Sequence, residues 1–164
     1  MITIISGGQT GVDATALRVA KNCNIPTGGL MPKGYMTEDG PQPSYAELYQ
    51  VKESEFEGYG HRTEVNVRSS NITLIFNAGE VGDGTRLTMR ECVKRSKNYK
   101  LFDVDVSDDE VPELVEEIVN YVKASREYRA KNCVINVAGT RGSKLGAENE
   151  ERLERILTEV FQGL

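Results

Sequence analysis

Three short segments combine glycine with hydroxyl side chains, the residue types that hold anionic oxygen. They are Gly7-Gly8-Gln9-Thr10-Gly11, Gly82-Asp83-Gly84-Thr85 and Gly139-Thr140-Arg141-Gly142-Ser143. Glycine lets a backbone approach a ligand closely, and the free N–H groups of a following helix attract phosphate. Two common fingerprints are absent. The first segment lacks the Lys-Ser/Thr of a P-loop and the G-x-G-x-x-G spacing of a dinucleotide site. The chemistry indicated is oxyanion binding outside these motifs.

Each segment follows a predicted strand and opens a predicted helix. Apolar runs at 2–5, 73–76 and 134–137 predict buried strands. Helical spacing predicts helices over 12–23 and 86–97, and a last helix whose apolar stripe contains Leu153, Ile156, Leu157, Val160 and Phe161. In the first helix we expect Thr10 to be the N-cap and Gly11 to lie in the first turn. Since helix propensity does not favour glycine there, a ligand or another backbone should pass close by.

The remaining pattern alternates in the same way. We expect a short helix at 62–70, a strand at 100–104 and a long helix over 109–130, with a Pro- and Gly-rich irregular segment at 26–44. This predicts one α/β domain over 1–164, a three-layer sandwich with a mostly parallel sheet. Right-handed crossovers bring the strand-to-helix loops to one edge of such a sheet, and ligands bind beyond the carboxyl ends of the strands.

Basic side chains at the same edge favour an anion. They are Lys33, Arg62, Arg86, Arg141 and Lys144, of which we favour the two that flank loops, Arg62 and Arg141, over Lys144. Asp13, Asp39 and Asp83 oppose a purely anionic ligand. Asp13 has open alternatives: it complements the helix dipole, accepts from a ligand hydroxyl or ring nitrogen, or holds Mg²⁺.

Other chemistry is poorly supported. His61 is the single histidine and has no partner for a catalytic triad. Four tyrosines could stack on a flat ring or simply belong to surface loops: Tyr35, Tyr45, Tyr49 and Tyr59. The three cysteines show no C-x-x-C spacing, so neither a zinc site nor a disulfide framework is indicated.

Composition narrows the partners. A net charge of −5 and a pI near 5.1 argue against a nucleic-acid or anionic membrane surface. No apolar run approaches the roughly 20 residues of a membrane span. A predicted strand begins just after Met1, so we expect no signal peptide and a cytoplasmic location.

Several segments together resemble the family of putative molybdenum carrier proteins. They are SGGQTGVDATAL at 6–17, GGLMPKGYMTEDG at 28–40, RTEVNVRSSNITLIF at 62–76, GDGTRLT at 82–88 and NVAGTRGSKLG at 136–146. The family is a circularly permuted branch of a Rossmann-like nucleotide-binding group that includes the lysine decarboxylase-like, cytokinin-activating LOG proteins. The resemblance implies a Rossmann-like fold, often dimeric, and a phosphorylated ligand.

The resemblance and the spacing together give one set of predicted ligand-binding residues. They are Gly7, Gly8, Gln9, Thr10, Gly11, Asp13, Lys33, Arg62, Thr63, Gly82, Gly84, Thr85, Thr88, Gly139, Arg141 and Ser143. Two positions depart from the family pattern: Thr140-Arg141-Gly142-Ser143 replaces Pro-Arg-Glu-Ser, and Ser70-Asn71 replaces Ser-Asp.

We expect a binding protein for a phosphorylated small molecule, with a molybdenum cofactor-like pterin or a nucleotide as candidates. No Cys lies in a candidate loop, so the phosphate is better supported than the metal. The alternative is a nucleotide-processing enzyme of the phosphoribohydrolase type, although the glutamate that follows Gly-Thr in LOG enzymes is absent after Gly84-Thr85. Asp13, Glu38 or Asp39 would then replace it. A third hypothesis is a nucleotide sensor.

Overall fold

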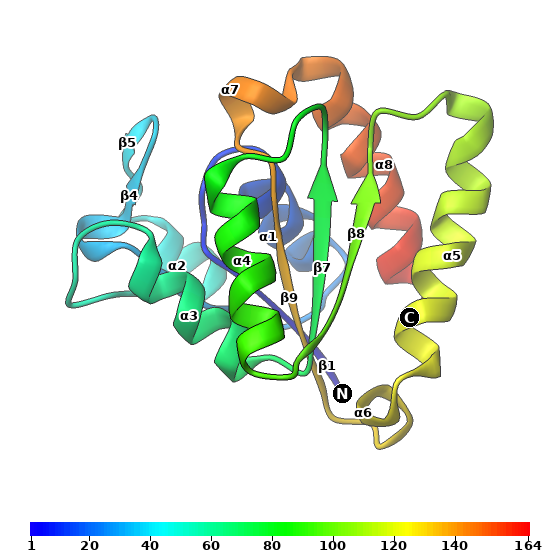
Figure 1. Cartoon of the computed structure of the whole chain (residues 1–164), viewed down its shortest axis with the longest axis horizontal. Helices are drawn as coiled ribbons and strands as arrows, with labels where there is room; N and C mark the ends of the chain where they lie inside the picture. The colour runs from blue at the N-terminus through cyan, green and yellow to red at the C-terminus, as the bar shows by residue number, and fades with distance from the viewer.

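The centre of the molecule is a five-stranded parallel sheet. In this computed structural model, which describes residues 1–164, the strand order is β2-β1-β9-β7-β8. The strands are β1 (Ile2–Ser6), β2 (Thr27–Gly28), β7 (Ile72–Asn77), β8 (Asn98–Asp103) and β9 (Cys133–Gly139). The three apolar runs predicted as buried strands are β1, β7 and β9, which lie side by side in the middle of the sheet (Figure 1).

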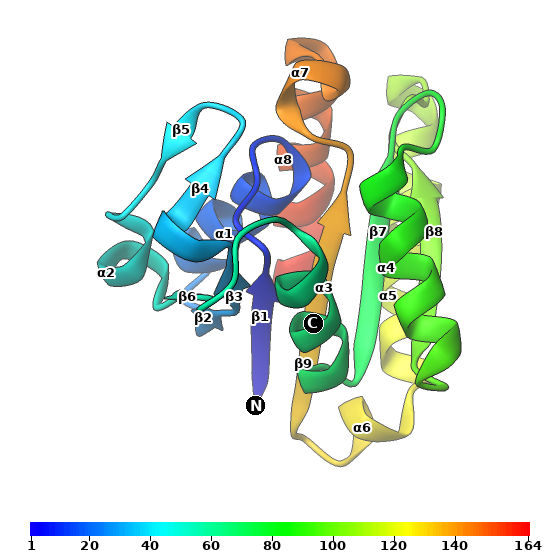
Figure 2. The same cartoon turned by 60° about the vertical axis from the view of Figure 1, so that its left-hand side comes forward.

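Helices cover both faces of this sheet. One face carries α1 (Val12–Asn22), α5 (Val111–Ala124) and α8 (Ala147–Gly163), which pack against one another. The other carries α3 (Gly60–Ser69) and α4 (Asp83–Lys94), which lie in front of the sheet in Figure 1 and again share one side in Figure 2. The predicted three-layer α/β/α sandwich is confirmed. None of these helices is both long and apolar enough to cross a membrane.

The two faces of the sheet differ in polarity. Neighbouring strands align Ile4, Ile135 and Ile72 in one row, and all three belong to the main apolar core with α1, α5 and α8. The alternate row brings Asn136 beside Thr73, and the Asn136 amide lies 3.4 Å from the Thr73 hydroxyl. No residue of α3 or α4 belongs to the main core. The layer between the sheet and these two helices is therefore the more polar one.

Two predicted segments were wrong in detail. The helix expected over 109–130 ends at Ala124, because Ser125 is extended and its hydroxyl accepts from Tyr128 N–H to start α6 (Arg126–Arg129). The segment expected to be irregular over 26–44 forms short strands instead: β2, β3 (Leu30–Met31), β4 (Met36–Thr37) and β5 (Gly40–Pro41). Asn66 of α3 ties β3 down, since its amide bonds both the N–H and the C=O of Leu30.

The other elements are short. They are α2 (Tyr45–Tyr49), β6 (Lys52–Glu53), α7 (Gly142–Leu145) and two single 3₁₀ turns, η1 (Lys33–Tyr35) and η2 (Asp108–Glu110). β6 pairs with β3, and β4 pairs with β5 to form a small hairpin beside the main body (Figure 2). The turn of this hairpin carries Glu38 and Asp39. It matters below because Glu38 reaches back to the site.

Candidate functional site

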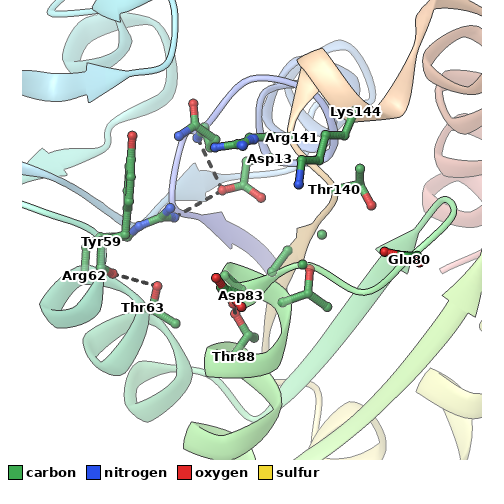
Figure 3. Close-up of a pocket in the computed structure, with 16 residues that line it drawn as sticks. Asp13, Tyr59, Arg62, Thr63, Glu80, Asp83, Thr88, Thr140, Arg141 and Lys144 are labelled. Carbon is green, nitrogen blue, oxygen red and sulfur yellow. Dashed lines mark hydrogen bonds and ion pairs between the residues drawn. The ribbon is translucent and has the colours of Figure 1, made fainter.

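A cavity of about 280 Å³ opens beyond the carboxyl ends of β1, β9 and β7. The chain leaves β1 for α1 on one face of the sheet and leaves β7 for α4 on the other, so this is where the crossovers diverge. Figure 3 shows the residues around it. They are Gln9, Asp13, Tyr59, Arg62, Thr63, Glu80, Gly82, Asp83, Gly84, Thr85, Thr88, Ala138, Gly139, Thr140, Arg141 and Lys144.

Ten of the predicted site residues lie in the wall of this cavity. They are Gln9, Asp13, Arg62, Thr63, Gly82, Gly84, Thr85, Thr88, Gly139 and Arg141. The structure therefore brings together parts of all three glycine segments and of α3. Six predicted residues do not line the cavity, namely Gly7, Gly8, Thr10, Gly11, Lys33 and Ser143. The first segment contributes its Gln9 and Asp13, and its glycines serve packing.

The cavity also contains residues that were predicted less strongly or missed. Lys144 was considered a weaker candidate than Arg62 and Arg141. It nevertheless lies in the cavity wall with them, because α7 follows the third glycine segment directly. The sequence analysis named Thr140 only as a hydroxyl residue of the third glycine segment, and Asp83 only as a negative charge that opposes a purely anionic ligand. Tyr59 was one of four tyrosines considered for stacking, and Glu80 and Ala138 were not predicted as site residues. The signal for Glu80 was its place between β7 and Gly82, in the same strand-to-helix loop.

The glycines of the first segment bring backbones together. Thr10 is not the N-cap of α1: that position is Gly11, with φ 79°, and no side chain caps the helix. A Cβ on Gly11 would lie 2.5 Å from the Gly142 nitrogen and 2.6 Å from the Thr140 oxygen. Of the two explanations for this glycine, a close second backbone is therefore correct. A Cβ on Gly7 would meet the Arg62 guanidinium, which lies over it.

Most of the N-terminal N–H groups of α1 and α7 already have partners within the protein. Val12 N–H donates to Thr140 O at 3.1 Å, and Ala14 N–H donates to Gln9 O at 2.9 Å. In α7, Gly142 N–H donates to Thr10 Oγ1 at 3.0 Å and Ser143 N–H donates to Glu38 Oε1 at 2.8 Å. The expectation of three helix ends open to one anion is therefore not met at these two helices.

The N-terminus of α4 is open. Its first backbone bond runs from Arg86 N–H to Gly82 O, and no side chain caps the N–H groups of Asp83, Gly84 and Thr85. A Cβ on Gly82 or Gly84 would meet no atom within 4 Å. Free N–H groups and the positive end of the helix dipole attract an anion at this point. Figure 3 shows Arg141 and Lys144 on the opposite side of the cavity from this helix.

Asp13 and Arg62 form a buried ion pair in the wall. The Arg62 Nη1 to Asp13 Oδ2 distance is 3.2 Å, with 12% of the Arg62 side chain and 5% of the Asp13 side chain exposed. Burial raises the pKa of Asp13 above its ordinary value, against the opposing effects of Arg62 and of the Gln9 N–H. Arg62 Nε has no partner. Asp13 is therefore mainly the counter-ion that holds Arg62 at the cavity, rather than a free carboxylate.

Of the three carboxylates invoked for glycosidic cleavage, Asp13 lines the cavity but is paired with Arg62. Glu38 and Asp39 do not line the cavity. Glu91, on the third turn of α4, pairs with Arg95 at 3.2 Å and is also outside it. Cleavage of a nucleotide needs a carboxylate near the leaving sugar. Glu80 and Asp83 also line the cavity, but the glutamate that follows Gly-Thr in LOG enzymes is Arg86 here, so the hydrolase hypothesis is not favoured.

The cavity contains no soft metal ligand. Cys23, Cys92 and Cys133 are free thiols outside it, and burial raises the pKa of Cys133 to about 11. No group of three or more His, Cys, Asp or Glu side chains has the geometry to hold a metal ion. His61 packs its ring against Phe56, with centroids 4.6 Å apart. The donors in the wall suit oxygen atoms of a ligand rather than a bound metal.

Comparison with known proteins supplies the family. The model of the circularly permutated YpsA SLOG family matches residues 4–161. The chain belongs to this family. A solved structure of a putative molybdenum carrier protein from Syntrophus aciditrophicus SB is 34% identical, with a TM-score of 0.77 over 97% of this chain and 93% of that one. No curated protein matches the chain.

Membership of the circularly permutated YpsA SLOG family bears out the resemblance and the Rossmann-like fold predicted from the sequence. The match begins in β1 and ends in α8, so it covers all three glycine segments and the α3 side of the cavity. The family also suggests a binding role for the protein.

Proposed function

We propose that this family member binds a phosphorylated small molecule in the cavity between β1, β9, β7 and α3. A nucleotide and a pterin phosphate of the molybdenum cofactor type are the two candidates. The observation that carries the proposal is the pairing of an open helix end with two cations. The uncapped N-terminus of α4 lies across the cavity from Arg141 and Lys144. The wall also holds three carboxylates, Asp13, Glu80 and Asp83, of which Asp13 is neutralised by Arg62.

Each positive group has a distinct capacity for phosphate. Arg141 can form two parallel hydrogen bonds to phosphate oxygens, whereas Lys144 acts as a point charge. The N–H groups of Gly84 and Thr85 have no partner in the protein. Thr85 and Thr88 add hydroxyls close to the same helix end, although Thr88 donates its proton to Gly84 O at 3.1 Å. This donor set fits a phosphate better than a neutral polar ligand.

An aromatic ring favours a flat partner for the rest of the ligand. Tyr59 is the one aromatic side chain in the wall, and it is 41% exposed. Arg62 lies 5.2 Å from its ring centroid and, through Asp13, keeps a fixed position beside it. The other three tyrosines considered for stacking lie outside the cavity. A base or a pterin could therefore stack at Tyr59 while its phosphate meets α4.

The residues fit the organic part of a molybdenum cofactor better than its metal. The phosphate and the ring find partners, but no thiol is available to a molybdenum atom. As cargo, the cofactor would be held by its pterin phosphate. The solved relative is named a putative molybdenum carrier protein, which supports such a cargo for this chain.

Titration calorimetry with AMP, ADP-ribose, molybdopterin and inorganic phosphate tests the proposal. We expect at least one organic phosphate to bind, and Lys144→Met to weaken it. Lys33→Met is the matched control, because Lys33 is an exposed lysine near the hairpin and outside the cavity. Binding of none of the four probes would overturn the proposal. Equal losses in the two lysine variants would move the ligand away from this cavity.

A further inference from the structure

Glu38 connects the β4–β5 hairpin to two walls of the cavity without lining it. Its carboxylate accepts from Ser143 N–H at 2.8 Å, from Ser143 Oγ at 2.7 Å and from the Thr10 hydroxyl. Its own N–H donates to Gln9 Oε1 at 2.9 Å. Its Oε2 lies 3.6 Å from Arg141 Nε. Of the residues it touches, Gln9 and Arg141 both line the cavity.

Glu38 approaches Arg141 from one side of its guanidinium group. Glu38 Oε2 lies on the Nε side of the guanidinium at an ion-pair distance of 3.6 Å, and none of the three Arg141 guanidinium nitrogens makes a hydrogen bond within the protein. Arg141 is half exposed, so without this partner its side chain would sample several rotamers. With the carboxylate of Glu38 on its Nε side, it keeps both terminal nitrogens available to the cavity. These two terminal nitrogens form a fork, the arrangement with which arginine binds a phosphate through two parallel hydrogen bonds.

All the hydrogen bonds that tie the hairpin to the first and third glycine segments come from Glu38. β4 and β5 pair only with each other, Met36 is 45% exposed, and a Cβ on Gly40 would meet nothing within 4 Å. Asp39, next to Glu38 on the same turn, forms no side-chain hydrogen bond or ion pair with the loops, and its N–H donates to Thr37 Oγ1. The attachment of the hairpin to the first and third glycine segments therefore depends on Glu38.

We propose that Glu38 is a positioning residue for ligand binding: it fixes Arg141 and Gln9 in the cavity wall so that the Arg141 fork is presented to the phosphate. This rests on the proposed function, because it concerns the phosphate end of the same ligand. The arrangement parallels that of Asp13 and Arg62. In both cases a carboxylate from a different element orients an arginine of the wall.

A double-mutant cycle separates this role from a general structural one. AMP and adenosine are titrated into the wild type, Glu38→Gln, Arg141→Met and the double variant, with Asp39→Asn as the matched control. We expect Glu38→Gln to raise the Kd for AMP about tenfold and to leave the Kd for adenosine unchanged. In the Arg141→Met background the same change should have no further effect on AMP, because the side chain it orients is gone.

The outcomes distinguish this proposal from the function on which it rests. Failure of the wild type to bind AMP, molybdopterin or phosphate overturns both. Normal AMP binding by Glu38→Gln overturns the positioning role alone, as does an equal loss with and without Arg141. Equal losses for AMP and adenosine would mean that Glu38 merely holds the loops together. An NMR signal of the Arg141 Nε–H that is protected in the wild type and exchanges rapidly in Glu38→Ala supports the contact itself.

Discussion

Arg62 lies against the buried carboxylate of Asp13, with 3.2 Å between its Nη1 and Asp13 Oδ2. Asp13 belongs to the first turn of α1 and Arg62 to the first turn of α3, so the pair joins the two faces of the sheet at the cavity. Gly7 makes the pair possible, because a side chain there would collide with the Arg62 guanidinium. The first glycine segment is thus adapted to hold a cation that a ligand can meet.

Removing one partner of this pair should destabilise the protein strongly. Asp13→Ala leaves the Arg62 charge buried and unpaired, which costs of order 3 kcal/mol. Arg62→Met should cost a similar amount, and the double variant less than the two single losses added together. Urea denaturation measures these values. Arg18→Met is the control, because its pair with Glu154 is about half exposed and should contribute less than about 1 kcal/mol. Strict additivity of Asp13 and Arg62 would contradict this prediction.

The Glu38 contacts should respond to acid in one direction. Burial alone would raise the pKa of Glu38, but the hydrogen bonds from Thr10 and Ser143 and the charge of Arg141 outweigh it and lower the pKa below its ordinary 4.5. A lowered pKa in the folded state adds stability that is present above the unfolded-state pKa and is lost as the pH falls through the folded-state value.

We therefore expect the stability difference between wild type and Glu38→Gln to be constant near neutral pH and to shrink only below pH 4.5. Denaturation curves at a series of pH values measure the difference, and a carbon NMR titration of the Glu38 carboxyl gives its midpoint directly. A midpoint at or above 4.5 would show that the contacts with Ser143 and Thr10 do not hold in solution.

The sequence predicted the sheet and most of the cavity because both depend on local patterns. Buried β-branched runs specified β1, β7 and β9, and the loops that follow them had to meet at one edge. That alone brought Gln9, Thr85 and Gly139 into one wall.

What the sequence did not predict depends on contacts between distant segments. Glu38 reaches Ser143 across more than a hundred residues, and no local pattern marks it as the partner of α7. Gly11 was expected inside the helix because its neighbour Thr10 is a good cap, yet Thr10 is used by Gly142 instead. Tyr59 could not be separated from three other tyrosines until α3 was placed. The roles of these residues follow only from the packing of segments that are far apart in the sequence.

Stacking on the Tyr59 ring should contribute to the binding free energy of a ligand that has an aromatic ring. We expect Tyr59→Leu to weaken the binding of AMP by about 1–3 kcal/mol, the usual contribution of stacking on an aromatic side chain. The affinity for ribose 5-phosphate, which has no base, should be unchanged. Tyr59→Phe, which keeps the ring, should bind AMP nearly as the wild type does. Calorimetry with both ligands measures the difference. Equal effects on the two ligands would assign Tyr59 to the shape of the wall and not to the ring.

Gly84 tests whether glycine in the second segment serves folding or the ligand. It lies in the first turn of α4, where φ is not positive and a Cβ would meet no atom within 4 Å. Alanine favours a helix over glycine by roughly 0.5–1 kcal/mol, so Gly84→Ala should leave the protein equally or more stable. If a phosphate lies against this helix end, the added methyl group should nevertheless raise the Kd for AMP about tenfold, which corresponds to about 1.4 kcal/mol of binding free energy.

Gly11→Ala provides the opposite case. Its φ of 79° and the Gly142 nitrogen 2.5 Å from the position of a Cβ leave no room for a side chain, so this variant should unfold at a clearly lower temperature. Thermal unfolding and AMP titration of both variants separate the two roles of glycine. We expect stability to be lost in Gly11→Ala and affinity, without loss of stability, in Gly84→Ala. Unchanged AMP affinity in Gly84→Ala would mean that the phosphate does not approach α4.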